Sequence, residues 1–309
     1  MEINLNALNR QALISAQAMM GDFAWGTVAL VAGVVTSTIA TLWLFAAGIL
    51  PAWAALLLIA ALTYMSYTPL HEAAHGNIHG RHNRLAWFGD LCGHACAPMI
   101  MLPHCSHRLE HLGHHRFTND PGKDPDFHIS KMRDGVGSFL VAPWRLLWIH
   151  NTYIFRDYWS NEASLQYKIT YVAELVFGLG WRVAFLTQVP LMTGIPVIFG
   201  GYALGAYFTI YWFAYRPHLP YEQKGRYVDT CTMSVPGWLK PFEWIWLGQT
   251  LHSIHHAFPR VPFYRYHSLF NQVEDAMRAH GGQVIDIITR EAVPPKRKQI
   301  FDDGGIRAS

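Results

Sequence analysis

Three imidazole side chains lie within five residues in the stretch HSIHH (252–256), and two related stretches precede it, HEAAH (71–75) and HLGHH (111–115). Helical residues three or four positions apart share one face, so each stretch directs at least two imidazoles the same way. One such pair alone is commonly a polar helix face. Three of them predict a metal centre, because neutral imidazole binds iron, zinc, copper or nickel without burying a charge.

The number of histidines predicts two metal ions. A single four- or six-coordinate ion cannot use the eight that these stretches supply. The four cysteines lie outside the stretches and lack CxxC spacing, so thiolate ligands are not needed. Nitrogen-only sites with open positions leave room for oxygen, which favours a redox pair over structural zinc. The predicted ligands are His71, His75, His111, His114, His115, His252, His255 and His256.

The composition indicates a membrane protein with one substantial polar part. Of 309 residues, 51% are hydrophobic and 15% charged, and a net charge of +3 gives no signal for nucleic acid binding. Residues 27–47 carry no charge, and about 20 such residues span a bilayer as a helix. A break at 48–51 precedes a second apolar stretch, 52–70. The apolar block 171–215 holds two further spans, with a break near 200–201 or near 194–196.

Lysine and arginine predict the orientation. They are missing from both expected helix connections, 48–51 and 194–201, and positive residues favour the cytoplasmic side. All 18 histidines follow residue 70, on that same side or at helix ends that face it. We therefore predict an all-α integral membrane protein, in which four transmembrane helices in two hairpins carry a cytosolic helical cap with the histidine-rich site. The metal site and both termini are expected on the cytoplasmic face.

The chain is interpreted as a single domain, 1–309. Its N-terminal segment 1–24 either lies on the membrane surface or forms an ordinary packed helix. The tail is expected to be frayed. The remaining segments are the first hairpin 27–70, the cytosolic region 71–168 with the first two histidine stretches, the second hairpin 171–215, the cap 216–281 with the third stretch, and the tail 282–309.

Longer stretches around these histidines resemble the three histidine boxes of the membrane fatty acid desaturase superfamily. They are HEAAHGNIH (71–79), HLGHHRFTNDPGKDPD (111–126) and GQTLHSIHHAFPRVPFYRYH (248–267). The resemblance covers roughly 71–128 and 212–267. The superfamily also has a lone histidine after the last transmembrane helix, and AYRPHLP (214–220) supplies His218, similar to the Pro-His-x-Pro stretch of carotenoid-modifying members. His218 is thereby implied as a ninth ligand.

The resemblance implies two non-haem iron ions, with O2 as co-substrate. It implies an oxidoreductase that desaturates or hydroxylates an unactivated C–H site of a hydrophobic lipid, foremost a fatty acyl chain. A carotenoid ring hydroxylase or ketolase is the alternative, and an alkane hydroxylase or alkene-forming fatty acid decarboxylase remains open. A zinc-binding membrane hydrolase or receptor without redox chemistry is an interpretation from a different class.

Outer partners of the metal ligands are expected because a ligating histidine passes its second ring N–H to a carboxylate or carbonyl. His79 and His107 belong to this set as flanking histidines. His79 continues the helical stripe of His71 and His75 by a further four positions, so a tenth ligand there stays open, as does metal binding by His107. No further catalytic residue is assigned. The candidate acids are Glu72, Glu110, Asp120, Asp124, Asp126 and Asp229.

Electrons are expected from a separate ferredoxin, rubredoxin or cytochrome b5-type donor, because the chain shows no cysteine cluster or dinucleotide fingerprint. Basic residues of the cytosolic face would either dock this donor or anchor lipid headgroups. They are Arg81, Arg84, Lys131, Arg133, Lys224 and Arg226.

Overall fold

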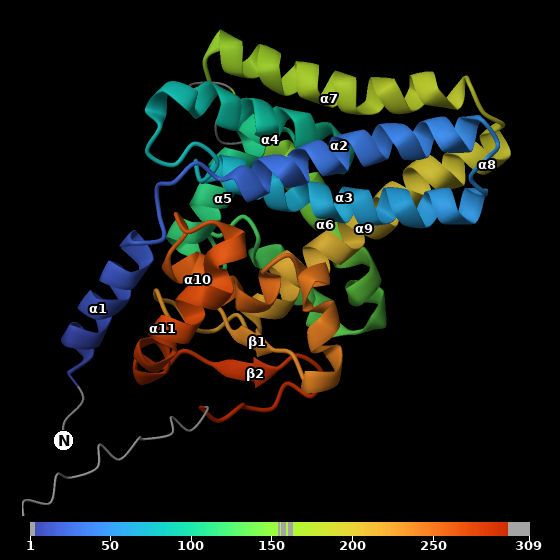
Figure 1. Ribbon diagram of the computed structural model, residues 1–309. Helices are drawn as coiled ribbons and strands as arrows, with labels where there is room; N and C mark the ends of the chain where they lie inside the picture. Colours follow the sequence, from blue (N-terminus) through green and yellow to red (C-terminus); the bar gives the residue numbers. More distant parts are fainter. Residues whose placement is uncertain (1–3, 154, 156–158, 160–162, 296–309) are drawn as a thin grey trace, which may run out of the picture.

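The computed structural model describes residues 4–153, 155, 159 and 163–295. Part of the predicted tail, 296–309, lies outside these residues, as do positions 1–3 of the N-terminal segment. Within the described chain the fold is mostly helical (Figure 1). Long apolar helices form one side of the molecule, and shorter elements that hold the third histidine stretch gather on the other.

Four helical runs are long and apolar enough to cross a membrane. They are α2 (Trp25–Ala46), α3 (Ala52–Ala74), α7 (Leu165–Leu186) and a run over Leu191–His218. The last run contains α8 (Leu191–Ile195), α9 (Gly201–Thr209) and two π-helical segments, Pro196–Gly200 and Ile210–Tyr215. A fifth candidate is a bent pair, α4 (Ala86–Ile100) and α5 (His104–Phe117), whose helices meet at 94°.

The position predicted from the sequence for the break between the last two apolar runs is wrong. Neither 194–196 nor 200–201 interrupts the chain, because Gly194, Gly200 and Gly201 all lie within continuous helical turns. The connection lies instead between Leu186 and Leu191. Pro196 begins a π-helical segment, a form that absorbs an irregular hydrogen-bond pattern without ending the helix. The glycines allow neighbouring segments to pack closely and do not form a turn.

Helix α3 is central to the apolar layer, because it packs against α2, α4 and α9. Two glycines of α9 allow its close approach to α3. A Cβ atom at Gly205 would lie 2.3 Å from the Ala60 carbonyl oxygen, and one at Gly201 would lie 2.9 Å from Ile59. Arg182 of α7 is buried and donates hydrogen bonds to the carbonyls of Pro98, Gly178 and Met99. It therefore ties α7 to the end of α4.

The polar side is built on α11 (Tyr266–Ala279), α6 (Val136–Tyr153) and the short α10 (His252–Ala257). Helix α1 (Leu5–Gln17) buries Ala12 and Ala16 in the cluster formed with α11, so the N-terminal segment contains a packed helix. Short 3₁₀ segments complete this side: Asn83–Leu85, Phe127–Asp134, Arg216–His218, Gly237–Trp246, Gln249–Leu251 and Phe263–Arg265.

Two short strands depart from the all-α prediction. Strand β1 (Thr232–Ser234) pairs in parallel with β2 (Val284–Asp286), with Thr232 opposite Val284. The tail was therefore predicted wrongly over its first residues, because 284–287 are held by this pairing and by burial of Ile287. Runs of three residues are too short to show a period, so the strands had no recognisable signal in the sequence.

Candidate metal centre

The nine predicted histidine ligands come from four helix ends or short helices. His71 lies in the last turn of α3 and His75 caps it, while α5 carries the second set in its C-terminal half. The third set fills α10, and His218 ends the last long apolar run. Helical spacing places the ligands of each set on a shared face, as the sequence predicted. The burial of eight of them is nearly complete, and His115 is partly buried.

Five of these histidines converge in a first group. Their ligand atoms lie within 4.8 Å of one another, and the members are His71, His75, His111, His115 and His255. The Nε2 atoms of His75 and His111 are 2.8 Å apart. The Nε2 atom of His115 lies 3.0 Å from that of His111 and 2.8 Å from that of His255.

His114, His218 and His256 form a second group, whose ligand atoms also lie within 4.8 Å of one another. His252 lies beside it, with its Nε2 atom 3.2 Å from the Nε2 atom of His218 and its ring centroid 4.7 Å from that of His256. The rings of His115 and His256 are 4.4 Å apart and join the two groups. All nine histidines are thus brought together, five in one group and four in the other.

Hydrogen bonds alone cannot satisfy the first group. A ring nitrogen carries either one hydrogen or one lone pair, so it makes one in-plane hydrogen bond. The Nε2 atoms of His75, His111, His115 and His255 form three successive close contacts, of which hydrogen bonds satisfy at most two. Nε2 of His71 and both ring nitrogens of His256 are buried and have no hydrogen-bond partner among the described residues. A cation that accepts several lone pairs resolves this arrangement, so the donor set fits a metal ion.

Three of the outward ring nitrogens have hydrogen-bond partners. Nδ1 of His114 lies 2.8 Å from Asp124 Oδ1, Nδ1 of His252 lies 2.8 Å from Gln249 Oε1, and Nδ1 of His255 lies 3.0 Å from the Tyr266 hydroxyl. A ring that donates from Nδ1 presents the Nε2 lone pair to the group. Burial also lowers the pKa of His252 to about 3 and that of His255 far below the ordinary value, which keeps both neutral.

Three of the six candidate acids touch the histidines. Asp124 also accepts hydrogen bonds from the backbone N–H groups of Asn119 and Asp126, which stabilises the loop that contains it. Asp126 lies 3.8 Å from His114 Nδ1, and Asp229 lies 3.7 Å from His256 Nδ1. Asp124 and Asp126 also form a compact acid–histidine cluster with His114.

The other three acids have different partners. Glu72 is buried and accepts from the Asn77 side chain and the Phe263 backbone. Glu110 lies 3.7 Å from His150, and Asp120 pairs with Lys224 near the surface. These contacts stabilise the chain around the histidines and do not include one of the nine.

The two flanking histidines lie in different surroundings. The sequence suggested that His79 continues the helical stripe of His71 and His75, but α3 ends at Ala74 and Gly76 has φ 68°. His79 instead lies against Gly76 and Gly89 and belongs to neither described group. His107 is buried, and its ring stacks 5.2 Å from that of His111. Within the part of the chain that the structure describes, neither of its ring nitrogens has a hydrogen-bond partner.

Sequence reasoning missed Gln249, Tyr266 and His150. Gln249 could have been found, because it precedes His252 by three residues, one helical turn. Tyr266 carried no signal, since a loop of several residues separates it from His255. His150 lies outside the three histidine stretches, and its Nε2 atom lies 2.6 Å from Asp126 Oδ1. Burial lowers the pKa of His150, but Asp126 and Glu110 outweigh this effect and raise it to about 9.

Comparisons with known proteins agree with this geometry. A family profile described as "Fatty acid desaturase" matches residues 47–287, which contain all nine histidines. The chain is 31% identical over 154 residues to a beta-carotene ketolase of Haematococcus lacustris, an alignment that covers 48% of this chain and 39% of that protein.

A second relative represents another chemistry. The chain is 25% identical over 227 residues to an sn-1 oleoyl-lipid 12-desaturase of a Picosynechococcus strain, over 68% of this chain and 53% of that protein. The chain thus spans about half the length, or less, of these curated relatives. Because the profile covers well over half of the sequence, the chain belongs to the fatty acid desaturase family.

Proposed function

We propose that this protein is an O2-dependent membrane di-iron oxidoreductase that desaturates or hydroxylates a hydrophobic lipid. The observation that carries the proposal is the convergence of nine histidines into two adjoining groups. The first group would hold one iron and the second, with His252, the other. Iron bound there supplies the redox chemistry by which O2 removes hydrogen from an unactivated C–H bond.

The residues around the groups have roles that follow from their contacts. Asp124, Gln249 and Tyr266 orient three of the imidazoles through Nδ1 and thereby hold the Nε2 atoms in place. Burial excludes water and keeps His252 and His255 neutral, the form that ligates a metal. Burial also lowers the pKa of His114, but Asp124 and Asp126 outweigh this effect and raise it to about 9, so a metal ion must displace a proton there. Asp126 and Asp229 supply negative charge close to the second group, which offsets part of the charge of a bound cation.

The substrate is proposed to be a fatty acyl chain, with a carotenoid ring as the second candidate. Membership in the desaturase family and the lipid desaturase among the relatives favour the acyl chain. The stretch around His218 and the ketolase relative favour the carotenoid. Both substrates are apolar and would reach the histidines from the bilayer.

We propose that the four apolar runs form two membrane hairpins, with the polar side and both termini in the cytoplasm. The single-domain organisation proposed from the sequence is retained, with the second hairpin redrawn from Leu165 to His218 around a connection at 187–190. The helix ends that bear His71, His75 and His218 would then lie at the cytoplasmic membrane surface.

Reduction would come from a separate ferredoxin, rubredoxin or cytochrome b5-type protein. Four of the suggested docking cations have internal partners. Arg81, Arg133 and Arg226 donate to the carbonyls of Met20, Pro220 and Ala257, and Lys224 pairs with Asp120. Arg84 and Lys131 are exposed and have no hydrogen-bond partner among the described residues, so they are the better candidates for an acidic donor.

The test uses the full chain purified without chelators. We expect about two irons per chain, and an O2-dependent change of an extracted lipid or carotenoid when a producing host expresses the protein. Mass spectrometry under ¹⁸O2 separates desaturation, which removes two hydrogens, from hydroxylation, which adds one ¹⁸O atom. A matched host expressing the His255→Ala variant should show no product. Stoichiometric zinc without iron, or product formation under strict anaerobiosis, would overturn the proposal in favour of a non-redox enzyme.

A further inference from the structure

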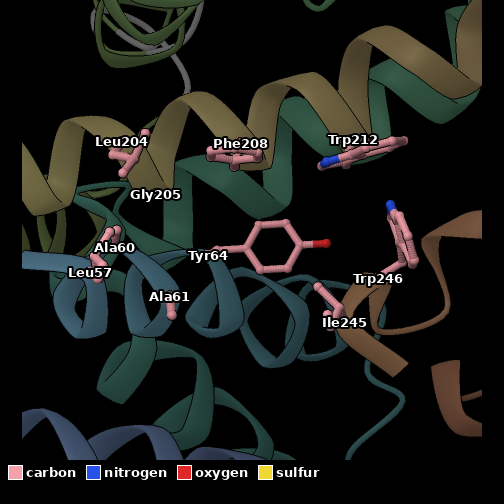
Figure 2. Close-up of a pocket in the computed structure, with 10 residues that line it drawn as sticks. All are labelled: Leu57, Ala60, Ala61, Tyr64, Leu204, Gly205, Phe208, Trp212, Ile245 and Trp246. Atoms are coloured by element: carbon pink, nitrogen blue, oxygen red, sulfur yellow. The ribbon is translucent and has the colours of Figure 1, made fainter. Parts of the chain in front are cut away.

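An apolar groove lies beside the histidine groups, between α3, α9 and the 3₁₀ segment Gly237–Trp246 (Figure 2). Its volume is about 440 Å³, within the range of about 300–1,000 Å³ that small-molecule sites occupy. None of its ten lining side chains carries a charge. Leu57 and Phe208 on its walls are about half exposed, so the groove is accessible from the apolar side of the molecule.

One end of the groove holds a polar atom without a partner. Tyr64 is only 8% exposed, and its hydroxyl makes no hydrogen bond among the described residues. Figure 2 shows this side chain crossing the groove, with the hydroxyl directed toward the indoles of Trp212 and Trp246. Leaving a buried hydroxyl unpaired is unfavourable, so a ligand oxygen that accepts a hydrogen bond from it would be stabilised here.

The same end of the groove lies one layer of aromatic rings from the first histidine group. The Tyr64 ring packs 5.9 Å from Phe213, whose ring lies 6.3 Å from His71. Tyr67 completes the layer, at 4.5 Å from Phe213 and 5.7 Å from His71. Trp246, on the opposite wall, precedes Gln249, the partner of His252, by three residues. Both walls of the groove are thus continuous with the chain segments that carry the histidines.

We propose that this groove binds the hydrocarbon body of a lipid, and that Tyr64 donates a hydrogen bond to a carbonyl or hydroxyl oxygen carried by it. This inference rests on the proposed function in one respect, namely that the lipid in the groove is the substrate. The uncharged walls select an apolar chain or ring, whereas Tyr64 selects molecules that bear an oxygen at the end next to the histidines. A pure hydrocarbon would fill the groove and leave the hydroxyl unpaired.

The test measures binding to the full chain in nanodiscs of a diether phospholipid, which brings no ester carbonyl into competition. The probes are a long-chain alkane, a mid-chain ketone of equal length and a fatty acid methyl ester, followed by tryptophan fluorescence. The wild type should bind one or both oxygen-bearing probes roughly tenfold more tightly than the alkane, the ratio that one ordinary hydrogen bond supports. Preference for the ketone indicates an oxygenated hydrocarbon as ligand, and preference for the ester indicates an acyl lipid.

Two pairs of variants locate the effect. Tyr64→Phe should abolish the preference and retain alkane binding, whereas Tyr202→Phe, on α9 outside the groove, should leave it unchanged. Leu57→Trp should weaken all three probes, whereas Leu58→Trp, at the adjacent exposed position that does not line the groove, should not. Equal binding of alkane and oxygen-bearing probes by the wild type, or a preference that survives Tyr64→Phe, overturns the inference.

The binding experiment is independent of the proposed reaction. It is carried out on the purified full chain with its bound metal, in the absence of O2 and reductant, so it needs no turnover. A failed iron or ¹⁸O2 experiment would therefore leave the binding result intact. Conversely, an iron- and O2-dependent product without any oxygen preference in binding would refute this inference and leave the proposed function standing.

Discussion

The Nε2 atom of His115 lies 2.8 Å from the Nε2 atom of His255, although 140 positions separate the two residues. His115 also contacts His111 of the first group and lies against the ring of His256 of the second. It is the histidine at which both groups meet, and its replacement should affect them together.

The His115→Ala variant should lose at least half of the bound iron and all product formation. Removing one imidazole opens the first group and withdraws packing from His256 in the second. Iron and protein are quantified on the same purified sample, with circular dichroism as the check on folding. His267→Ala is the control, because His267 is exposed and belongs to neither group. A folded His115→Ala protein with full iron would remove this residue from the ligand set.

The Asp124→Asn variant should weaken iron binding by roughly 10–100-fold, the usual effect of losing an outer partner of a ligating histidine. Both carboxylate oxygens of Asp124 accept hydrogen bonds, from His114, Asn119 and Asp126. In the variant side chain an NH2 group replaces one of these oxygens, so at least one N–H donor loses its acceptor. Chelator competition measures the change. Asp120→Asn, in the same loop but paired with Lys224, should bind iron as the wild type does. Equal affinities for the two variants would contradict an orienting role for Asp124.

The Tyr266→Phe variant should retain two irons with altered coordination of His255. The hydroxyl is 3.0 Å from His255 Nδ1, and its loss leaves that buried nitrogen without its partner. We expect roughly tenfold weaker iron binding and a changed Mössbauer quadrupole splitting. Tyr264→Phe, at a 42% exposed position nearby, serves as the matched control. An unchanged spectrum in Tyr266→Phe would show that the hydroxyl does not orient the imidazole.

The Gly205→Ala variant should destabilise the apolar layer by about 1–3 kcal/mol, the range for overpacked interiors. Its Cβ atom would lie 2.3 Å from the Ala60 carbonyl oxygen, so α9 must move away from α3. Loss of monodisperse protein on heating in detergent reports the effect. Gly33→Ala on α2 should be neutral or stabilising, because nothing lies within 4 Å of the added atom and alanine favours helix. If both variants lose monodisperse protein at the same temperature, the close approach of α9 to α3 does not limit the stability of the protein.

Much of the apolar architecture followed from composition and spacing. Uncharged runs of sufficient length predicted α2 and α3 nearly to their ends, because no other structure hides so many backbone polar groups. The second pair was found but divided at the wrong place, since glycine that permits close helix packing looks the same in the sequence as glycine that ends a helix. Only the contacts of Gly201 and Gly205 with α3 distinguish the two uses.

The sequence by itself predicted eight of the nine histidines that converge, because helical spacing fixes the common direction of imidazoles within each stretch. His218 came from the resemblance to the desaturase superfamily. The tertiary structure decided how nine of them divide, five around His115 and four around His256, since that division depends on the crossing of α3, α5 and α10. It also decided which partners hold them, as with Tyr266 and Asp124. Local periodicity sets the direction of a side chain, whereas packing between distant segments sets what it meets.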